Sequence, residues 1–148
     1  MSINLRDKLK EAKKNSELKV IKNLITLKTH IQVDDITCNN INYQEIIDIS
    51  YDKMKLKKNH FDTTSERKNF ESFFSENPDQ EQISFMVKTK SSVFFLSLPC
   101  ISIKNNLDFF WDKDNTLSQS DDKIFVKNDF SKGFVILKSE YGIETGSW

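Results

Sequence analysis

The chain has 148 residues, and its 37% hydrophobic content, with 12 phenylalanines but only 3 glycines and 2 prolines, excludes a disordered or low-complexity protein. A chain of this length buries about 68–70% of its unfolded surface, which is enough for one domain with a real core. Its 22 basic and 22 acidic residues cancel in number, but they are unevenly distributed along the chain.

Three stretches differ in charge. Residues 1–28 contain eight Lys or Arg and three acids, residues 29–52 contain five acids and no Lys or Arg, and residues 105–148 contain eight acids and five lysines. The neutral total therefore conceals a basic N-terminal segment and two acidic zones.

Several features bear on the compartment. Cys38 and Cys100 are far apart, and the N-terminal residues lack the apolar core of a signal peptide, so we expect free thiols. The longest apolar run, 93–98, has the length of a strand rather than of a membrane helix. We expect a cytoplasmic protein that does not span or bind a membrane.

Helical patterns dominate the first half. Residues 2–29 predict one long helix, or two helices broken near Asn15 and Ser16, with Leu18, Ile21 and Ile25 on one face. Asn42 and Glu45 form a capping-box pattern that opens a second helix, although the isoleucine-rich run 45–50 also suits a strand.

A third helix is predicted after Thr63. Glu66 follows at capping-box spacing, and the helix carries three of the phenylalanines before it ends at Asn77 and Pro78.

After Pro78 the apolar pattern changes to the period of a strand. Residues 83–88 alternate, a turn near Lys90 leads to the run 93–98, and Ile101 and Ile103 are placed as a continuation beyond Pro99. Further strands are expected at 124–126 and 134–137. The sequence therefore predicts one α+β domain over residues 1–148, with N-terminal helices (about 1–77) packed on a C-terminal antiparallel sheet of four or five strands (about 82–148).

Catalytic and metal-binding patterns are weak. His30 and His60 have acids nearby but lack a second histidine at i+4, and neither cysteine belongs to a CxxC pair. Three glycines cannot build a phosphate-binding loop, and the acids after residue 107 lack the glycine and glutamate of an EF-hand. We therefore expect no enzyme activity, no metal and no cofactor.

The basic N-terminal helix lacks the pattern of a nucleic-acid surface. Its lysines have no interleaved aromatic residues on which bases could stack, and the chain has only two arginines, Arg6 and Arg67. A solvated lysine face is the simpler interpretation, and we expect no nucleic-acid partner.

A dense aromatic and acidic run occupies residues 106–114. Three adjacent rings, at 109–111, cannot all be buried on one face, so at least one is expected near the surface beside carboxylates. Trp148, beyond the last clear strand, is expected either to dock on the protein or to be offered to a partner.

The chain resembles the small cytosolic immunity proteins of bacterial polymorphic-toxin and contact-dependent inhibition systems. The resemblance rests on the compact α+β layout and on the runs 107–112 and 130–136, followed by Glu140, Tyr141 and Gly142 and by Ser147 and Trp148. It covers about the last third of the chain.

This resemblance implies a stoichiometric inhibitor that binds the C-terminal domain of a cognate toxin, often a nuclease, which is basic because it binds phosphates. Carboxylates of the inhibitor would steer the encounter. From the acidic composition, the first choice of contact residues is Asp108, Trp111, Asp112, Asp114, Asp121 and Asp122. The second choice is Asp34, Asp35 and Asp48. The alternatives are a self-associating regulatory or structural domain, or a small enzyme of unknown class.

Overall fold

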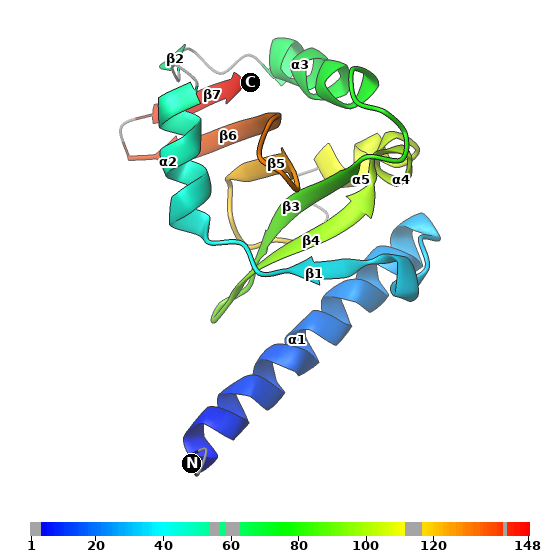
Figure 1. Ribbon diagram of the computed structural model, residues 1–148, viewed down its shortest axis with the longest axis vertical. Coiled ribbons are helices and arrows are strands. Elements are labelled where there is room, and N and C mark those ends of the chain that lie inside the picture. Colours follow the sequence, from blue (N-terminus) through cyan, green and yellow to red (C-terminus); the bar gives the residue numbers. More distant parts are fainter. Residues whose placement is uncertain (1–3, 54–56, 59–62, 112–116, 141) are drawn as a thin grey trace.

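A single antiparallel sheet forms the centre of the protein, with its strands in the order β1-β4-β3-β5-β6-β7-β2 (Figure 1). The computed structural model describes residues 4–53, 57–58, 63–111, 117–140 and 142–148. The strands are β1 (Thr37–Asn39), β2 (Lys57–Lys58), β3 (Gln82–Lys88), β4 (Val93–Pro99), β5 (Lys123–Lys127), β6 (Gly133–Ser139) and β7 (Gly142–Ser147).

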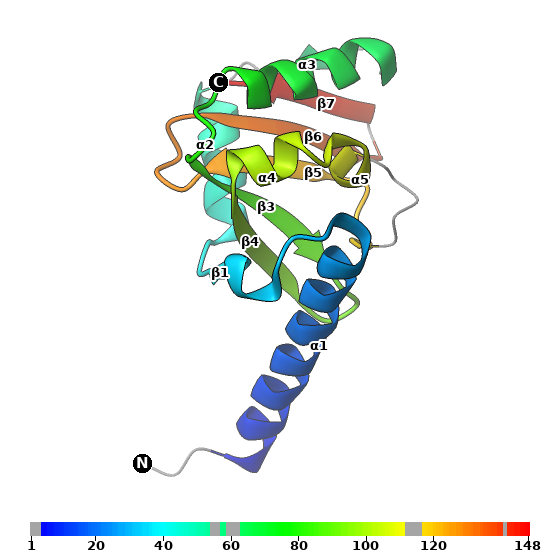
Figure 2. The ribbon, with the colours of Figure 1, turned by 90° about the vertical axis from the view of Figure 1, so that its right-hand side faces the viewer.

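Helices cover both faces of this sheet. They are α1 (Leu5–Thr29), the 3-10 turn η1 (Val33–Asp35), α2 (Tyr43–Lys53), α3 (Thr63–Ser75), α4 (Cys100–Lys104) and α5 (Leu107–Trp111). Helix α2 lies on one face, and α3, α4 and α5 lie on the other together with the C-terminal half of α1 (Figures 1 and 2). None of the described helices has the length and hydropathy needed to cross a membrane.

The alternation of apolar residues in the strands separates two cores. In β3, Ile83, Phe85 and Val87 pack with α1, α3 and α5, whereas Met86 points to the opposite face and packs with Ile46 of α2. Successive side chains of a strand point to opposite faces, so a strand covered on both sides is apolar at nearly every position. The alternation of residues 83–88 therefore separates the side chains of β3 that pack on one face of the sheet from those that pack on the other.

The α+β class is confirmed, but the predicted four or five strands are too few. The described residues form six strands of three or more residues, and the two-residue β2 is a seventh. The strands that were missed, β1 and β7, carry weak signals: β1 has three residues, and β7 contains two glycines and one isoleucine. Both are held by ladders to stronger strands, β1 to β4 and β7 to β6.

The helices lie mostly in the N-terminal part of the chain, as predicted, but each part also contains elements of the other kind. Strands β1 and β2 lie within the first part, and α4 and α5 lie within the second. The placement of Ile101 and Ile103 in a strand was wrong, because Pro99 ends β4 and α4 begins at Cys100, where Ile103 becomes buried.

The helix starts follow their caps. Helix α1 is unbroken through Asn15 and Ser16, and its N-terminus is capped by the side chain of Asn4, which accepts from the Arg6 amide. Asn42 Oδ1 accepts from the amides of Gln44 at 2.8 Å and Glu45 at 3.4 Å, so Asn42 caps α2 as expected and residues 45–50 are helical.

Candidate protein-binding surface

The aromatic run of residues 109–111 forms part of the core. It lies on the short helix α5, where Phe110 is buried against Phe85 with ring centroids 5.2 Å apart. Trp111 is half-buried, and its ring centroid lies 4.9 Å from that of Phe70. Phe109 is half-buried as well. The expectation of a ring near the surface is met by Phe109 and Trp111, but both rings pack on the core.

The charge around this helix is mixed. Arg67 of α3 pairs with Asp108 at 2.7 Å and with Glu71 at 2.8 Å. Arg67 and Lys123 also approach the Trp111 ring, with their charged groups 5.9 and 5.8 Å from its centroid. Asp112 and Asp114 lie outside the described residues. Among the described residues, Asp108 and Trp111 of the first-choice set therefore lie beside Arg67 and Lys123, and the surface around them is not uniformly acidic.

Asp121 and Asp122 lie on the loop before β5. Asp122 Oδ1 accepts from the Lys138 amide at 2.7 Å, and its Oδ2 accepts from the Tyr43 hydroxyl at 3.2 Å. Asp121 is 3.4 Å from Lys138 Nζ. Because Tyr43 is the first residue of α2, these contacts place Asp122 beside the N-terminus of α2 and not beside Asp108.

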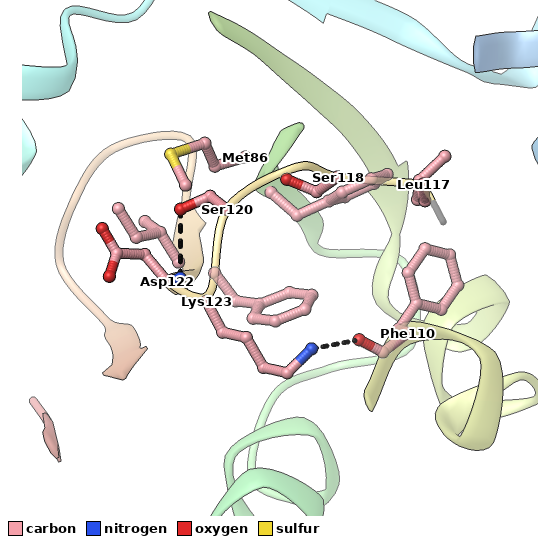
Figure 3. A pocket seen from close by; sticks show the side chains of 10 residues that line it. Met86, Phe110, Leu117, Ser118, Ser120, Asp122 and Lys123 are labelled. Atoms are coloured by element: carbon pink, nitrogen blue, oxygen red, sulfur yellow. Dashed lines mark hydrogen bonds between the residues drawn. The ribbon is translucent and has the colours of Figure 1, made fainter. Parts of the chain in front are cut away.

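A small cavity lies beneath the same loop (Figure 3). Phe110 and Leu117 line one side of it, and Lys123 Nζ approaches the Phe110 carbonyl oxygen at 3.5 Å. Its volume is about 50 Å³, whereas ligand pockets usually hold about 300–1,000 Å³. This cavity is too small for a metabolite, and among the described residues no group of three His, Cys, Asp or Glu could hold a metal ion.

The solvent-facing side of α2 is acidic. Glu45, Asp48 and Asp52 are all exposed, and α2 contains no Lys or Arg before Lys53. At about 100° per residue these three carboxylates fall on one side of the helix, opposite the buried Ile46 and Ser50. Asp48 also accepts a hydrogen bond from Gln44 Nε2 at 3.0 Å.

Two exposed tyrosines of α2 each contact a further carboxylate, but only Tyr51 borders the acidic side. Tyr43 lies about 170° away around the helix, on the same side as the buried Ser50. Tyr43 is 37% and Tyr51 is 53% exposed, and each hydroxyl donates to a carboxylate, that of Asp122 at 3.2 Å and that of Glu144 at 2.7 Å. Partial burial and the charge of Asp122 raise the pKa of Tyr43, and the hydrogen bond to Glu144 raises the pKa of Tyr51. Both tyrosines therefore stay neutral donors that hold the carboxylates beside the helix.

We call the following set the α2 acidic face: Glu45, Asp48, Tyr51, Asp52 and Glu144. Of the predicted residues it includes Asp48, whereas Asp122 lies with Tyr43 on the other side of α2. The structure does not bring the others to it: Asp108 and Trp111 lie on the opposite face of the sheet, and Asp34 and Asp35 lie in η1, exposed, between α1 and β1. Asp121 lies beside Asp122 but pairs with Lys138.

The tyrosines and Glu144 were missed by sequence reasoning. The acids in residues 29–52, which contain no Lys or Arg, did indicate that the exposed side of α2 would be acidic. The contacts of Tyr43 with Asp122 and of Tyr51 with Glu144 span 79 and 93 residues, and no local pattern reports them.

His30 and the buried Cys100 have structural surroundings. His30 ends α1 in the left-handed conformation, with φ 62°, and its amide donates to the Thr26 carbonyl. Cys100 is fully buried, its thiol lies 3.4 Å from the Phe74 carbonyl oxygen, and burial raises its pKa. An inert thiol is the consequence. His60 lies outside the described residues.

Comparison with known proteins found no matching family model, no matching curated protein and no matching solved structure. The function must therefore be inferred from the surface itself.

Proposed function

We propose that this chain binds a basic protein surface through the α2 acidic face. The observation that carries the proposal is the combination of three exposed carboxylates on α2 with exposed Tyr51, which borders them and donates a hydrogen bond to a further carboxylate, that of Glu144. Tyrosine supplies large contact area at low entropic cost, and carboxylates steer a cationic partner toward it.

The biological role that we propose is that of a cytoplasmic immunity protein, which neutralises the C-terminal domain of a toxin by covering it. A nuclease toxin suits this face because enzymes that bind phosphate backbones present lysine and arginine at their substrate surface. The carboxylates of the α2 acidic face would occupy the places of phosphates. The chain would thus act by stoichiometric binding and not by catalysis.

The test begins with affinity capture, using the whole protein as bait in its source organism. The proposal requires one stoichiometric protein partner that is toxic alone and is neutralised when mixed with this chain. The double variant Asp48→Lys/Asp52→Lys should then weaken binding at least tenfold, mainly through a slower association rate that responds to salt.

The matched control is Asp34→Lys/Asp35→Lys, which makes the same change of charge on η1, away from α2. This control should bind and protect like the natural protein. Equal loss in both variants would show that only net charge matters, and loss in the control alone would move the site to η1. A partner without toxicity would overturn the immunity role but not the protein-binding role.

A further inference from the structure

Helix α1 carries two apolar rows on opposite sides. The inner row, Leu18, Ile21 and Ile25, packs on the sheet. On the outer side, Leu5, Leu9, Val20 and Leu27 are 70%, 63%, 64% and 73% exposed. At about 100° per residue, the outer residues fall within a sector of about 60°, diametrically opposite the inner row. The exposed leucines are therefore not scattered, and they form a second face of the helix.

This outer row runs along nearly all of α1. The row contains seven exposed positions: 5, 9, 12, 16, 20, 23 and 27. Five of them are apolar, including Ala12, and the other two are Ser16 and Asn23. Steps of four, three and four repeat every eleven residues, so the row drifts by only about 20° around the helix in each repeat. From Leu5 to Leu27 the row is about 33 Å long. A narrow row of this kind is typical of a seam between two helices.

The fold leaves the row accessible. The N-terminal half of α1 extends away from the sheet, and the remainder packs on the sheet through its inner side (Figures 1 and 2). Because the four apolar residues of the outer row are 63–73% exposed, a second helix can lie along it without displacing an element of the described part of the chain.

Only cations flank the outer row. Arg6 and Lys13 lie on one side of it and Lys8 and Lys19 on the other, each within about 80° of its centre and all exposed. The acids of α1 lie farther round the helix, at Asp7, Glu11 and Glu17. Glu17 accepts hydrogen bonds from Thr89 and Ser91 of the β3–β4 turn, at 2.9 and 2.6 Å. The row is therefore apolar at its centre and positive at both borders.

The positive charge beside the outer row indicates which kind of partner can bind to it. Pairing of α1 with α1 of a second copy would place lysines against lysines, which is unfavourable. A membrane surface suits a wide apolar face with aromatic residues, and this row is narrow and has none. An amphipathic helix with Asp or Glu beside its apolar seam satisfies both the apolar centre and the cationic borders.

We propose that the outer row of α1 is a docking site for an acidic amphipathic helix of a partner protein. This inference does not depend on the α2 acidic face, which lies on another element and favours a basic partner. The chain would then have two protein-binding surfaces of opposite charge.

The test uses two synthetic helical peptides as probes. Both carry leucines at the spacing of the outer row; one has glutamates at the flanking positions and the other has lysines. Fluorescence anisotropy with the whole protein should show saturable binding of the glutamate peptide and at least tenfold weaker binding of the lysine peptide. Equal binding of both peptides, or no binding of either, would overturn the proposal.

Variants locate the site. Leu9→Gln/Val20→Gln removes the apolar centre, and Lys13→Glu/Lys19→Glu reverses the borders; each should weaken binding of the glutamate peptide at least tenfold. The matched control Lys10→Glu/Lys28→Glu makes the same charge change off the row and should weaken it less than threefold. Circular dichroism checks that the variants remain folded.

Two further measurements distinguish the other occupants. A dimer seen by sedimentation and abolished by Leu9→Gln/Val20→Gln would assign the row to a second copy of this chain and overturn the acidic-helix proposal. Binding to phosphatidylserine vesicles without binding to the glutamate peptide would assign it to a membrane surface, with the same consequence.

Discussion

The indole ring of Trp148 lies directly over Gly133, so close that a Cβ added at Gly133 would overlap the ring carbons. The two residues also exchange backbone hydrogen bonds, Gly133 N to Trp148 O at 3.2 Å and Trp148 N to Gly133 O at 3.0 Å. Trp148 Nε1 donates to the Phe130 carbonyl at 3.0 Å. Of the two expectations for this tryptophan, docking on the protein is the one that the structure shows.

Gly133→Ala should therefore destabilise the protein by about 1–3 kcal/mol, because the new methyl group must displace the indole. Tryptophan fluorescence should shift to longer wavelength as the ring becomes more exposed. Urea denaturation of the variant measures the change in the free energy of unfolding.

A double-mutant cycle identifies the cause. In a Trp148→Ala background the ring is absent, so Gly133→Ala should be neutral or should stabilise by up to about 1 kcal/mol through the unfolded state. A loss of stability as large as in the natural background would show that the strain lies in the backbone at residue 133 and not in the contact.

Phe70 is the centre of the aromatic core. Its ring lies 4.9 Å from those of Phe74 and Trp111 and 5.2 Å from that of Phe125, and it is fully buried. Phe70→Ala should cost about 3–5 kcal/mol in the free energy of unfolding. Asp108→Ala, which breaks an exposed ion pair with Arg67, should cost at most about 1 kcal/mol. Comparable costs would mean that the charge, rather than ring packing, holds α5.

The two cysteines should differ in reactivity toward a thiol reagent such as Ellman's reagent. Cys38 is exposed on the edge strand β1 and should react within seconds to minutes. Cys100 is buried with a raised pKa and should react only when the protein unfolds. One fast thiol in the natural protein and none in Cys38→Ser is the expected result; two fast thiols would contradict the buried position of Cys100.

The contact of Tyr43 with Asp122 predicts a dependence on alkaline pH. Partial burial of the phenol, the negative charge of Asp122 and the hydrogen bond that the phenol donates to it raise the pKa of Tyr43 above its ordinary value, about 10. A raised pKa in the folded state contributes stability that is fully present below pH 10 and is lost as the pH rises through the raised pKa.

Absorbance titration of tyrosine ionisation measures this effect. The difference between the natural protein and Tyr43→Phe isolates the Tyr43 step, which should occur above the ordinary range and should move down in Asp122→Asn. Asparagine retains an oxygen that accepts from the Lys138 amide, but it replaces the charged oxygen that accepts from the Tyr43 hydroxyl with a neutral NH2 group. An unchanged step in Asp122→Asn would show that burial alone raises the pKa.

Patterns that depend on near neighbours were predicted correctly. The α1 face with Ile21 and Ile25, the Asn42 cap and the strands around Phe85 and Leu96 all follow from a local period or a local hydrogen bond. Strands β1 and β7 could not be found in this way, because their formation depends on the ladder that a distant strand supplies. The same applies to Ile103, which is buried by a helix that begins after Pro99.

The candidate site was predicted in part. Composition indicated two acidic zones, and the structure shows that Asp122 of one lies beside α2 of the other. It also shows that Arg67 neutralises Asp108, a pairing across 41 residues that charge counting along the chain cannot report. The immunity role and the acidic partner helix stay predictions for the experiments above.

Residue type and spacing were enough to predict the α+β class, the period of each long element and the charge of each segment, because these depend on neighbours within a few turns. Three further features follow from the tertiary structure: which acids share a surface, that Trp148 covers Gly133, and that Leu5 and Leu27 stay exposed while Ile25 is buried. The physical reason is that burial and charge pairing depend on the segments that meet in space, and here these are commonly separated by 40 to 90 residues.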